Sequence, residues 1–292
     1  MEPLEGRTIS ILGLGASGAA AARLALFKGG KVYVSDRQVE PSAAAGAAEL
    51  RNLGARVDFG GHDLERLAQS DTVVVSPGIP PDAPVLQALR AAGRRWISEP
   101  EFAFRFLEGP LIAVTGTNGK TTTAAMTAHL LQGSGVQVGL GGNIGADLGP
   151  PASGLALMSP TPDWFVVEVS SFQLADIQEF SPTIGVLTNL APDHLDRYGS
   201  LGDYYADKKK LFLNARPESA WILNGDSDEV EELAGEAAGD RFRFSIRNPG
   251  AKPETVSAHA FLAGEELALR LPGEELETLL PRKDLPLSLI HI

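Results

Sequence analysis

Two glycine-rich turns, each between a β-type run and a helical run, constrain the fold of this 292-residue chain most strongly. The first turn, at residues 13–18 (GLGASG), follows the β-type run Thr8–Leu12 and precedes an alanine-rich helical run. The second turn, at residues 116–122 (GTNGKTT), follows Leu111–Thr115 and opens another helix. Strand, tight turn and helix in this order are typical of parallel sheets whose helix N-termini bind phosphate. The chain is therefore predicted to be an α/β protein with two phosphate-binding turns.

The first turn has the spacing of a dinucleotide-binding site. Asp36 ends the next β-type run, Lys31–Ser35, about 20 residues further on, where such a site carries an acid for the ribose. On these residues alone NAD is the expected ligand, and an NAD-dependent oxidoreductase is one open alternative. The motif does not specify which nucleotide binds.

The second turn has the chemistry of a phosphate loop. Lys120 would neutralise charge on the β- and γ-phosphates, and the Thr121 hydroxyl would be a ligand of Mg²⁺. The pattern departs from the usual loop because Val114 stands where the first glycine is expected, and that glycine is displaced to Gly116. A dehydrogenase does not need this loop, so it predicts ATP as a second nucleotide.

The alternation of β-type and helical runs places a domain boundary near residue 98. We predict a Rossmann-like domain over residues 1–98 and a central phosphate-loop ATPase-type α/β domain over residues 99–292. A length near 300 residues accommodates two domains. We expect a loop at Gly149–Pro162. The other predicted strands are Thr72–Ser76, Arg95–Ser98, Val136–Leu140, Trp164–Val169, Ile184–Thr188 and Ala220–Leu223, and the predicted helices are Ala19–Phe27, Val85–Ala92, Thr121–Leu131 and Leu201–Asn214.

Composition excludes several classes of function. Lys and Arg number 25 against 37 Asp and Glu, a net charge of −12 that disfavours binding to nucleic acid or to an anionic membrane. The chain has no cysteine, so it has no disulfide and no thiolate metal site. No apolar run approaches the ~20 residues that a membrane-spanning helix needs. We expect a cytoplasmic protein.

Several charged residues follow β-type runs and are candidates for metal or phosphate binding. Glu168 ends a buried apolar run beside the phosphate loop, where a carboxylate is a natural Mg²⁺ ligand. His194, in the polar loop Asp193–Arg197, would bind metal or phosphate, although an isolated loop histidine is more often only solvated. One lysine of Lys208–Lys210 is expected to point inward from a helix. The remaining histidines lack such neighbours and receive no role: His62, His129, His259 and His291.

Four separated segments resemble the Mur ligases of peptidoglycan synthesis. These are residues 115–122 (TGTNGKTT), 141–145 (GGNIG), 168–174 (EVSSFQL) and 189–198 (NLAPDHLDRY). The shortened phosphate loop is usual in that family, so the departure at Val114 agrees with it. With the first glycine turn included, the resemblance spans roughly residues 7–226.

The resemblance implies a reaction and its ligands. A Mur ligase of this type would use ATP to phosphorylate the carboxylate of UDP-N-acetylmuramoyl-L-alanine, and the amine of D-glutamate would then attack the acyl phosphate. The first domain would hold the uridine diphosphate rather than NAD. By this resemblance, the family's third domain, which binds the amino acid, is expected to be absent from this chain. This chain is therefore expected to bind the UDP-substrate without joining D-glutamate. A monomer is expected, and a non-catalytic nucleotide-binding protein stays an open alternative.

The resemblance also implies residue roles. Lys120, His194 and Lys208 would be catalytic, with Lys208 carbamylated by CO₂ so that it becomes an anion able to face metal. Two Mg²⁺ ions would be held by Thr121, Glu168, His194 and Lys208. ATP would bind at Gly116, Thr117, Asn118, Gly119, Lys120, Thr121 and Thr122. The UDP-substrate would contact Ala16, Ser17, Asp36, Arg37, Gly78, Asn143, Ser170 and Gln173.

Overall fold

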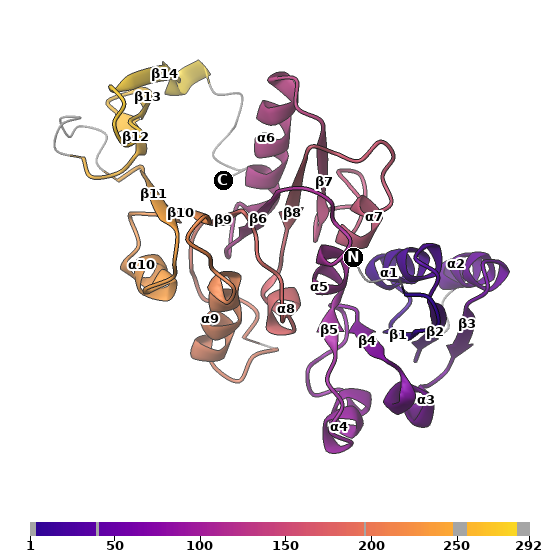
Figure 1. Cartoon of the computed structure of the whole chain (residues 1–292). Helices are drawn as coiled ribbons and strands as arrows, with labels where there is room; N and C mark the ends of the chain where they lie inside the picture. Colours follow the sequence, from indigo (N-terminus) through magenta and orange to yellow (C-terminus); the bar gives the residue numbers. More distant parts are fainter. Residues whose placement is uncertain (1–3, 39–40, 196, 248–255, 285–292) are drawn as a thin grey trace.

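The structure, a computed structural model, describes residues 4–38, 41–195, 197–247 and 256–284 (Figure 1). Two sheets follow one another along the chain, a five-stranded sheet within residues 8–98 and a nine-stranded sheet within residues 111–281. In Figure 1 the first sheet and its helices, in indigo and purple, form a lobe beside the second sheet. The predicted α/β class is confirmed. No helix in the described ranges is long and apolar enough to span a bilayer.

The first sheet is parallel and has the strand order β3-β2-β1-β4-β5. The order reverses between β1 and β4, so the carboxyl ends of these two strands flank a crevice in which such sheets bind ligands. Its strands are β1 (Thr8–Leu12), β2 (Lys31–Asp36), β3 (Arg56–Phe59), β4 (Thr72–Val75) and β5 (Ile97–Ser98). Its helices are α1 (Ala16–Phe27), α2 (Pro41–Asn52), α3 (Leu64–Gln69) and α4 (Pro84–Ala91).

The second sheet has the order β14-β13-β12-β11-β10-β9-β6-β8-β7 and is parallel except for β12–β14. Its strands are β6 (Leu111–Thr115), β7 (Val138–Gly142), β8 (Trp164–Glu168), β9 (Ile184–Leu187), β10 (Ala220–Asn224), β11 (Asp240–Ser245), β12 (Ala260–Ala263), β13 (Glu266–Leu269) and β14 (Glu277–Pro281). Its helices are α6 (Lys120–Gly133), α7 (Ala152–Leu155), α8 (Ser171–Ala175), α9 (Leu201–Lys209) and α10 (Asp228–Ala234), with 3-10 turns η1 (Lys210–Phe212) and η3 (Arg282–Asp284).

The central strands of both sheets are buried on both faces, which explains why they are rich in apolar residues. Leu111 and Ala113 of β6 enter one core cluster, whereas Ile112 and Val114 enter the cluster on the opposite face. In the first sheet Ile9 and Ile11 pack on one side, and Leu12 packs on the other. A parallel sheet covered by crossover helices produces this pattern.

Several sequence-based boundaries need correction. The expected loop Gly149–Pro162 contains α7, a single turn that begins after Pro151. The helix expected to continue to Asn214 ends as α-helix at Lys209 and tightens into η1. The following elements were not predicted: α2, α3, α5, α8, β3 and β11–β14. The apolar run at residues 285–292, which includes His291, lies outside the described residues.

The link between the sheets, α5 (Glu99–Phe104), is held by two fully buried carboxylates. Glu99 Oε1 accepts a hydrogen bond from the backbone N–H of Ser153 at 2.5 Å. Glu101 accepts bonds from the backbone N–H groups of Gln178, Glu179 and Phe180 at 2.9–3.1 Å. The carboxylates of Glu99 and Glu101 thus anchor α5 to the backbone of the second sheet's domain.

Replacing Glu99 with glutamine is expected to flatten the pH dependence of stability. Burial raises the pKa of Glu99 from 4.5 to about 7, and its bonds to Ser153 and Ala152 act in the opposite direction. Between those pH values the folded chain keeps a proton that the unfolded chain releases, so the free energy of unfolding falls as pH rises. Urea titrations at pH 5 and pH 8 measure this. The variant should gain stability relative to wild type only at pH 8, and exposed Glu108→Gln is the control. An unchanged slope in Glu99→Gln would contradict the account.

Candidate functional site

The predicted phosphate loop leaves β6 at the carboxyl edge of the second sheet. Gly116 has φ of 144°, and a Cβ at this position would lie 2.0 Å from Thr188 Oγ1, so only glycine fits. Gly119, with φ of 78°, precedes α6 as its N-cap. In the described part of the chain no side chain caps α6. The helix therefore begins on a glycine turn, the arrangement that binds phosphate at a helix N-terminus.

The segment after β9 holds the loop in shape. Asn189 Oδ1 accepts from the backbone N–H of Asn118 at 2.9 Å, and Asn189 Nδ2 donates to the carbonyl of Asn118 at 3.0 Å. Thr188 Oγ1 donates to the same carbonyl at 2.7 Å. Thr117 Oγ1 donates to the carbonyl of Ala191 at 3.1 Å. These bonds join residues about 70 positions apart and preorganise the loop before any nucleotide arrives.

Lys120 and Thr121 lie at the start of α6, as predicted. Lys120 Nζ donates to the carbonyl of Thr117 at 2.8 Å, which keeps the ammonium over the loop. Thr121 Oγ1 donates to Glu168 Oε2 at 2.6 Å. Glu168 ends β8, is buried, and its other oxygen accepts from Asn143 Nδ2 at 3.2 Å.

The Thr121–Glu168 pair fits a small divalent cation. Adjacent ligands of an octahedral Mg²⁺, each 2.0–2.1 Å from the ion, lie about 2.9 Å apart. The two oxygens are 2.6 Å apart, so a shift of a few tenths of an ångström would admit the ion. Both donors are oxygens, which Mg²⁺ prefers.

Lys208 and His194 meet around one aromatic ring. Lys208 Nζ lies 4.7 Å from the centre of the Tyr204 ring, and the His194 ring centre lies 6.1 Å from it. Lys208 Nζ also donates to the carbonyl of Gly116 at 2.7 Å, which ties α9 to the phosphate loop. His194 has φ of 53° and lies 3.5 Å from a carboxylate oxygen of Asp193. The structure thus brings three predicted site residues to the carboxyl edge of the second sheet: Gly116, His194 and Lys208.

Lys208 is the inward-facing member of the lysine run. Its side chain is buried, whereas Lys209 is exposed and Lys210 pairs with Asp207 at 2.9 Å. Burial, and to a lesser extent the charge of Lys120, lower the pKa of Lys208 to about 7, with Asp193 acting in the opposite direction. A large fraction of the amine is therefore neutral and nucleophilic near pH 7.

Nowhere in the described residues do three or more His, Cys, Asp or Glu side chains gather around a possible metal position. The predicted metal set contains only two residues of those types, Glu168 and His194, and takes its other members from Thr121 and Lys208. The predicted metal set therefore stays a prediction.

The first sheet carries a separate cavity of about 700 Å³ at the crevice between β1 and β4. The turns after β1, β2 and β4 contribute most of its walls. Five of the predicted substrate residues line it: Ala16, Ser17, Asp36, Arg37 and Gly78. These five residues, which were predicted from separate sequence motifs, therefore line a single cavity that is large enough for a nucleotide.

Asp36 shapes this cavity through its own backbone contacts. Its Oδ2 accepts from the N–H of Leu14 at 2.7 Å, and its Oδ1 accepts from the N–H of Gln38 at 2.8 Å. The carboxylate predicted to bind ribose therefore also fixes the glycine turn. Each carboxylate oxygen has a second lone pair that stays available to a ligand.

The other predicted substrate residues form local structure in the second sheet. Ser170 and Gln173 make a reciprocal capping box at the start of α8, with bonds of 2.9 and 3.3 Å. Asn143 donates to Glu168 as described. Gln173 also lines a small cavity of about 80 Å³ together with Ser76 and Pro77 of the first sheet. Their contact with substrate stays a prediction.

Comparison with known families assigns both parts of the chain. Residues 114–281 match the Mur ligase middle domain, and residues 7–98 match the MurD-like N-terminal domain of Mur ligases. The first match alone covers more than half of the chain. The chain belongs to the Mur ligase family.

Individual relatives agree with this family. The UDP-N-acetylmuramoylalanine--D-glutamate ligase of Desulfatibacillum aliphaticivorans is 39% identical over 88% of this chain and 56% of its own length. The protein of the same name from Acidobacterium capsulatum is 37% identical over 99% of this chain and 60% of its own length. This Mur ligase chain therefore spans less than two thirds of these relatives.

Among solved structures, a UDP-N-acetylmuramate:L-alanyl-gamma-D-glutamyl-meso-diaminopimelate ligase from Neisseria meningitides aligns with a TM-score of 0.57. The alignment covers 94% of this chain and 84% of that one at 20% identity. At this identity the likeness establishes the Mur ligase fold only.

Three residues of this Mur ligase site were missed from the sequence. Tyr204 lies between His194 and Lys208, and Asn189 holds Asn118. His62, which received no role, lines the cavity of the first sheet beside Asp36 and Arg37. The only signal for His62 was its position after the Gly60-Gly61 pair, at the end of an unpredicted strand.

Proposed function

We propose that the protein containing this chain is an ATP-dependent ligase that joins D-glutamate to UDP-N-acetylmuramoyl-L-alanine. One observation carries the proposal. The phosphate loop includes Thr121, whose Oγ1 lies 2.6 Å from Glu168 Oε2. Lys208 and His194 lie at the same carboxyl edge of the second sheet, where Lys208 contacts the loop. This arrangement serves phosphoryl transfer and has no use in hydride transfer. Relatives that are 35–39% identical to this chain are named as ligases of the same two substrates, which supports the proposal.

In this proposal the chain's residues stabilise the negative charge on the transferring phosphoryl group. A substrate carboxylate oxygen attacks the γ-phosphorus of ATP, and the bond to the ADP oxygen breaks. Lys120 would neutralise the equatorial oxygens, and the N-terminus of α6 would hold the remaining phosphates. Mg²⁺ bound by Thr121 and Glu168 would add electrostatic stabilisation of the same charge.

The acyl phosphate then becomes an amide. The D-glutamate amine attacks the carbonyl carbon, loses a proton, and the bond from that carbon to the phosphate oxygen breaks. Phosphate leaves with one oxygen of the original carboxylate. The cavity of the first sheet would hold the uridine diphosphate, with Ala16 and Ser17 at the N-terminus of α1 and Asp36, Arg37 and Gly78 on its walls.

A carbamate on Lys208 is part of the proposal. The neutral amine adds to CO₂, loses one proton, and becomes an anion beside His194. The lowered pKa of Lys208, caused first by burial, supports this reaction at neutral pH. Lys208 and His194 would then hold a second Mg²⁺.

Transfer of ¹⁸O tests the acyl phosphate directly. The whole protein that contains this chain is incubated with ATP, Mg²⁺, D-glutamate and substrate labelled with ¹⁸O in the terminal carboxylate. One labelled oxygen in the released phosphate is the expected result. Product formation without label in phosphate would contradict this chemistry.

The proposal includes a monomer in the cytoplasm, where the nucleotide substrates are made.

Two alternatives predict different ligands. An NAD-dependent oxidoreductase would fill the first cavity with NAD and leave the phosphate loop without a role. A non-catalytic nucleotide-binding protein would bind ATP without releasing phosphate.

A further inference from the structure

His62 lies on the wall of the first-sheet cavity and has no assigned role. It follows β3, next to Asp63, which is the N-cap of α3. The side chain is half-buried and faces the same volume as Asp36 and Arg37. This inference rests on the proposed function, because it concerns the uridine nucleotide of the proposed substrate.

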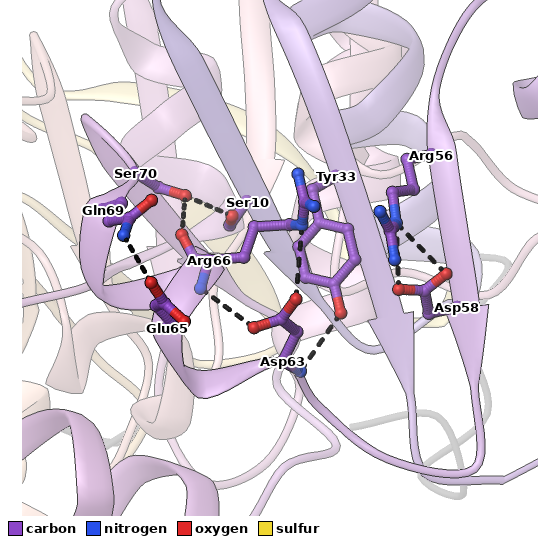
Figure 2. Close-up of polar contacts among 9 residues, drawn as sticks. All are labelled: Ser10, Tyr33, Arg56, Asp58, Asp63, Glu65, Arg66, Gln69 and Ser70. Atoms are coloured by element: carbon purple, nitrogen blue, oxygen red, sulfur yellow. Dashed lines mark hydrogen bonds and ion pairs between the residues drawn. The ribbon is translucent and has the colours of Figure 1, made fainter.

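The segment that carries His62 is held firmly. Figure 2 shows the N–H of Asp63 donating to the Tyr33 hydroxyl, at 3.2 Å, and the Asp63 carboxylate accepting from the N–H of Arg66, at 3.0 Å. The Arg66 guanidinium also lies 5.4 Å from the centre of the Tyr33 ring. These contacts tie the start of α3 to β2 and leave His62 little freedom to move.

The orientation of the imidazole is set by Ser35. The Ser35 hydroxyl is completely buried and lies 2.8 Å from Nδ1 of His62. In the described residues this hydroxyl has no other acceptor, and a buried hydroxyl proton needs one. Ser35 therefore donates to Nδ1, which leaves the ring proton of neutral His62 on Nε2.

The imidazole is neutral at physiological pH. Burial lowers the pKa of His62 below 6.5, Asp36 opposes that effect, and Arg37 adds to it. A neutral ring with its proton on Nε2 presents one hydrogen-bond donor to the cavity and carries no net charge. Such a donor suits a carbonyl oxygen better than a phosphate.

His62 lies beside the part of the cavity that would hold the nucleoside, not beside the part that would hold the diphosphate. The diphosphate belongs at the N-terminus of α1, beside Gly15–Ser17, where the helix dipole favours an anion. The nucleoside then lies toward the end of β2, at Asp36. His62, at the end of the neighbouring strand β3, borders that half of the cavity.

We propose that His62 is a specificity-determining residue that recognises the base, with Nε2–H donating to the 4-carbonyl oxygen of uracil. Cytosine carries an amino group at this position, so two donors would face each other and the base would be rejected. The predicted consequence is selection of uridine over cytidine nucleotides.

Calorimetric titration with UDP and CDP tests the proposal. Wild type is expected to bind UDP at least tenfold more tightly than CDP. His62→Ala should weaken UDP about tenfold, the effect of one lost hydrogen bond, and leave CDP nearly unchanged, so that discrimination approaches one. Ser35→Ala, which frees Nδ1 but keeps the imidazole, should reduce discrimination partly. His129→Ala, an exposed histidine on α6, is the matched control.

The outcomes separate the inference from the proposed function. Unchanged UDP affinity in His62→Ala, or an equal loss for UDP and CDP, overturns base recognition even if wild type binds UDP-N-acetylmuramoyl-L-alanine. Failure of wild type to bind either uridine ligand overturns the proposed function and this inference together. Circular dichroism and thermal unfolding of each variant separate loss of binding from loss of folding.

Discussion

Replacing Lys208 with alanine should lower ligase turnover by about a thousandfold in the whole protein. In the proposed function this residue is a carbamylated metal ligand, and a metal contributes several kcal/mol of charge stabilisation in such a reaction. Lys208 is buried, and its Nζ contacts the carbonyl of Gly116. Turnover is measured as release of phosphate that depends on D-glutamate.

Chemical rescue distinguishes a carbamate from a lysine that only stabilises the fold. Acetate can replace the missing carboxylate of the Lys208→Ala variant, so a partial return of activity is expected at high acetate concentration. Lys209→Ala makes the same substitution at the next, exposed position of α9 and should keep full activity. Lys208→Met preserves packing and tests whether the fold survives. Wild-type activity in Lys208→Ala, or no rescue in a folded variant, argues against the carbamate.

Lys120→Ala should lower turnover by roughly 10²–10³-fold, the effect of removing one donor aimed at developing charge. ATP affinity should fall as well, because the ammonium lies over the phosphate loop. Binding of UDP-N-acetylmuramoyl-L-alanine should not change, since its cavity is on the first sheet. Initial rates at varied ATP concentration and calorimetry with the UDP-substrate separate the two effects.

The Lys120 prediction has a clear contrary result. Turnover that is unchanged in Lys120→Ala would mean that the loop holds something other than the transferring phosphate. Equal losses of ATP and UDP-substrate binding would instead mean that the two sites fold as one unit.

Local sequence was sufficient to predict the central strands and the phosphate loop. The bounds of β1 and β6 agree with the predicted runs, because strands buried on both faces are rich in apolar and β-branched residues. The loop was predictable because glycine, lysine and threonine are adjacent in the sequence. Short edge strands were missed, since the four residues of β3 (RVDF) give too little alternation to detect.

Residues that act through distant contacts could not be predicted from their own sequence environment. Tyr204 reaches Thr117 across 87 positions, and Ser35 reaches His62 across 27. The structure also gives Ser170 and Gln173 capping roles at the start of α8 that the sequence did not predict, and their contact with substrate stays a prediction. The hydrogen-bond partner of a polar side chain near a site therefore becomes known only from the structure.

Calorimetric titration of this chain with UDP-N-acetylmuramoyl-L-alanine, with NAD as the comparison ligand, tests the central claim most directly. The claim is that the first-sheet cavity is a uridine nucleotide site and that the second sheet serves ATP. The account predicts binding of the UDP-substrate at one site and no binding of NAD. Binding of NAD without binding of the UDP-substrate would contradict the account and return the first glycine turn to a dinucleotide function.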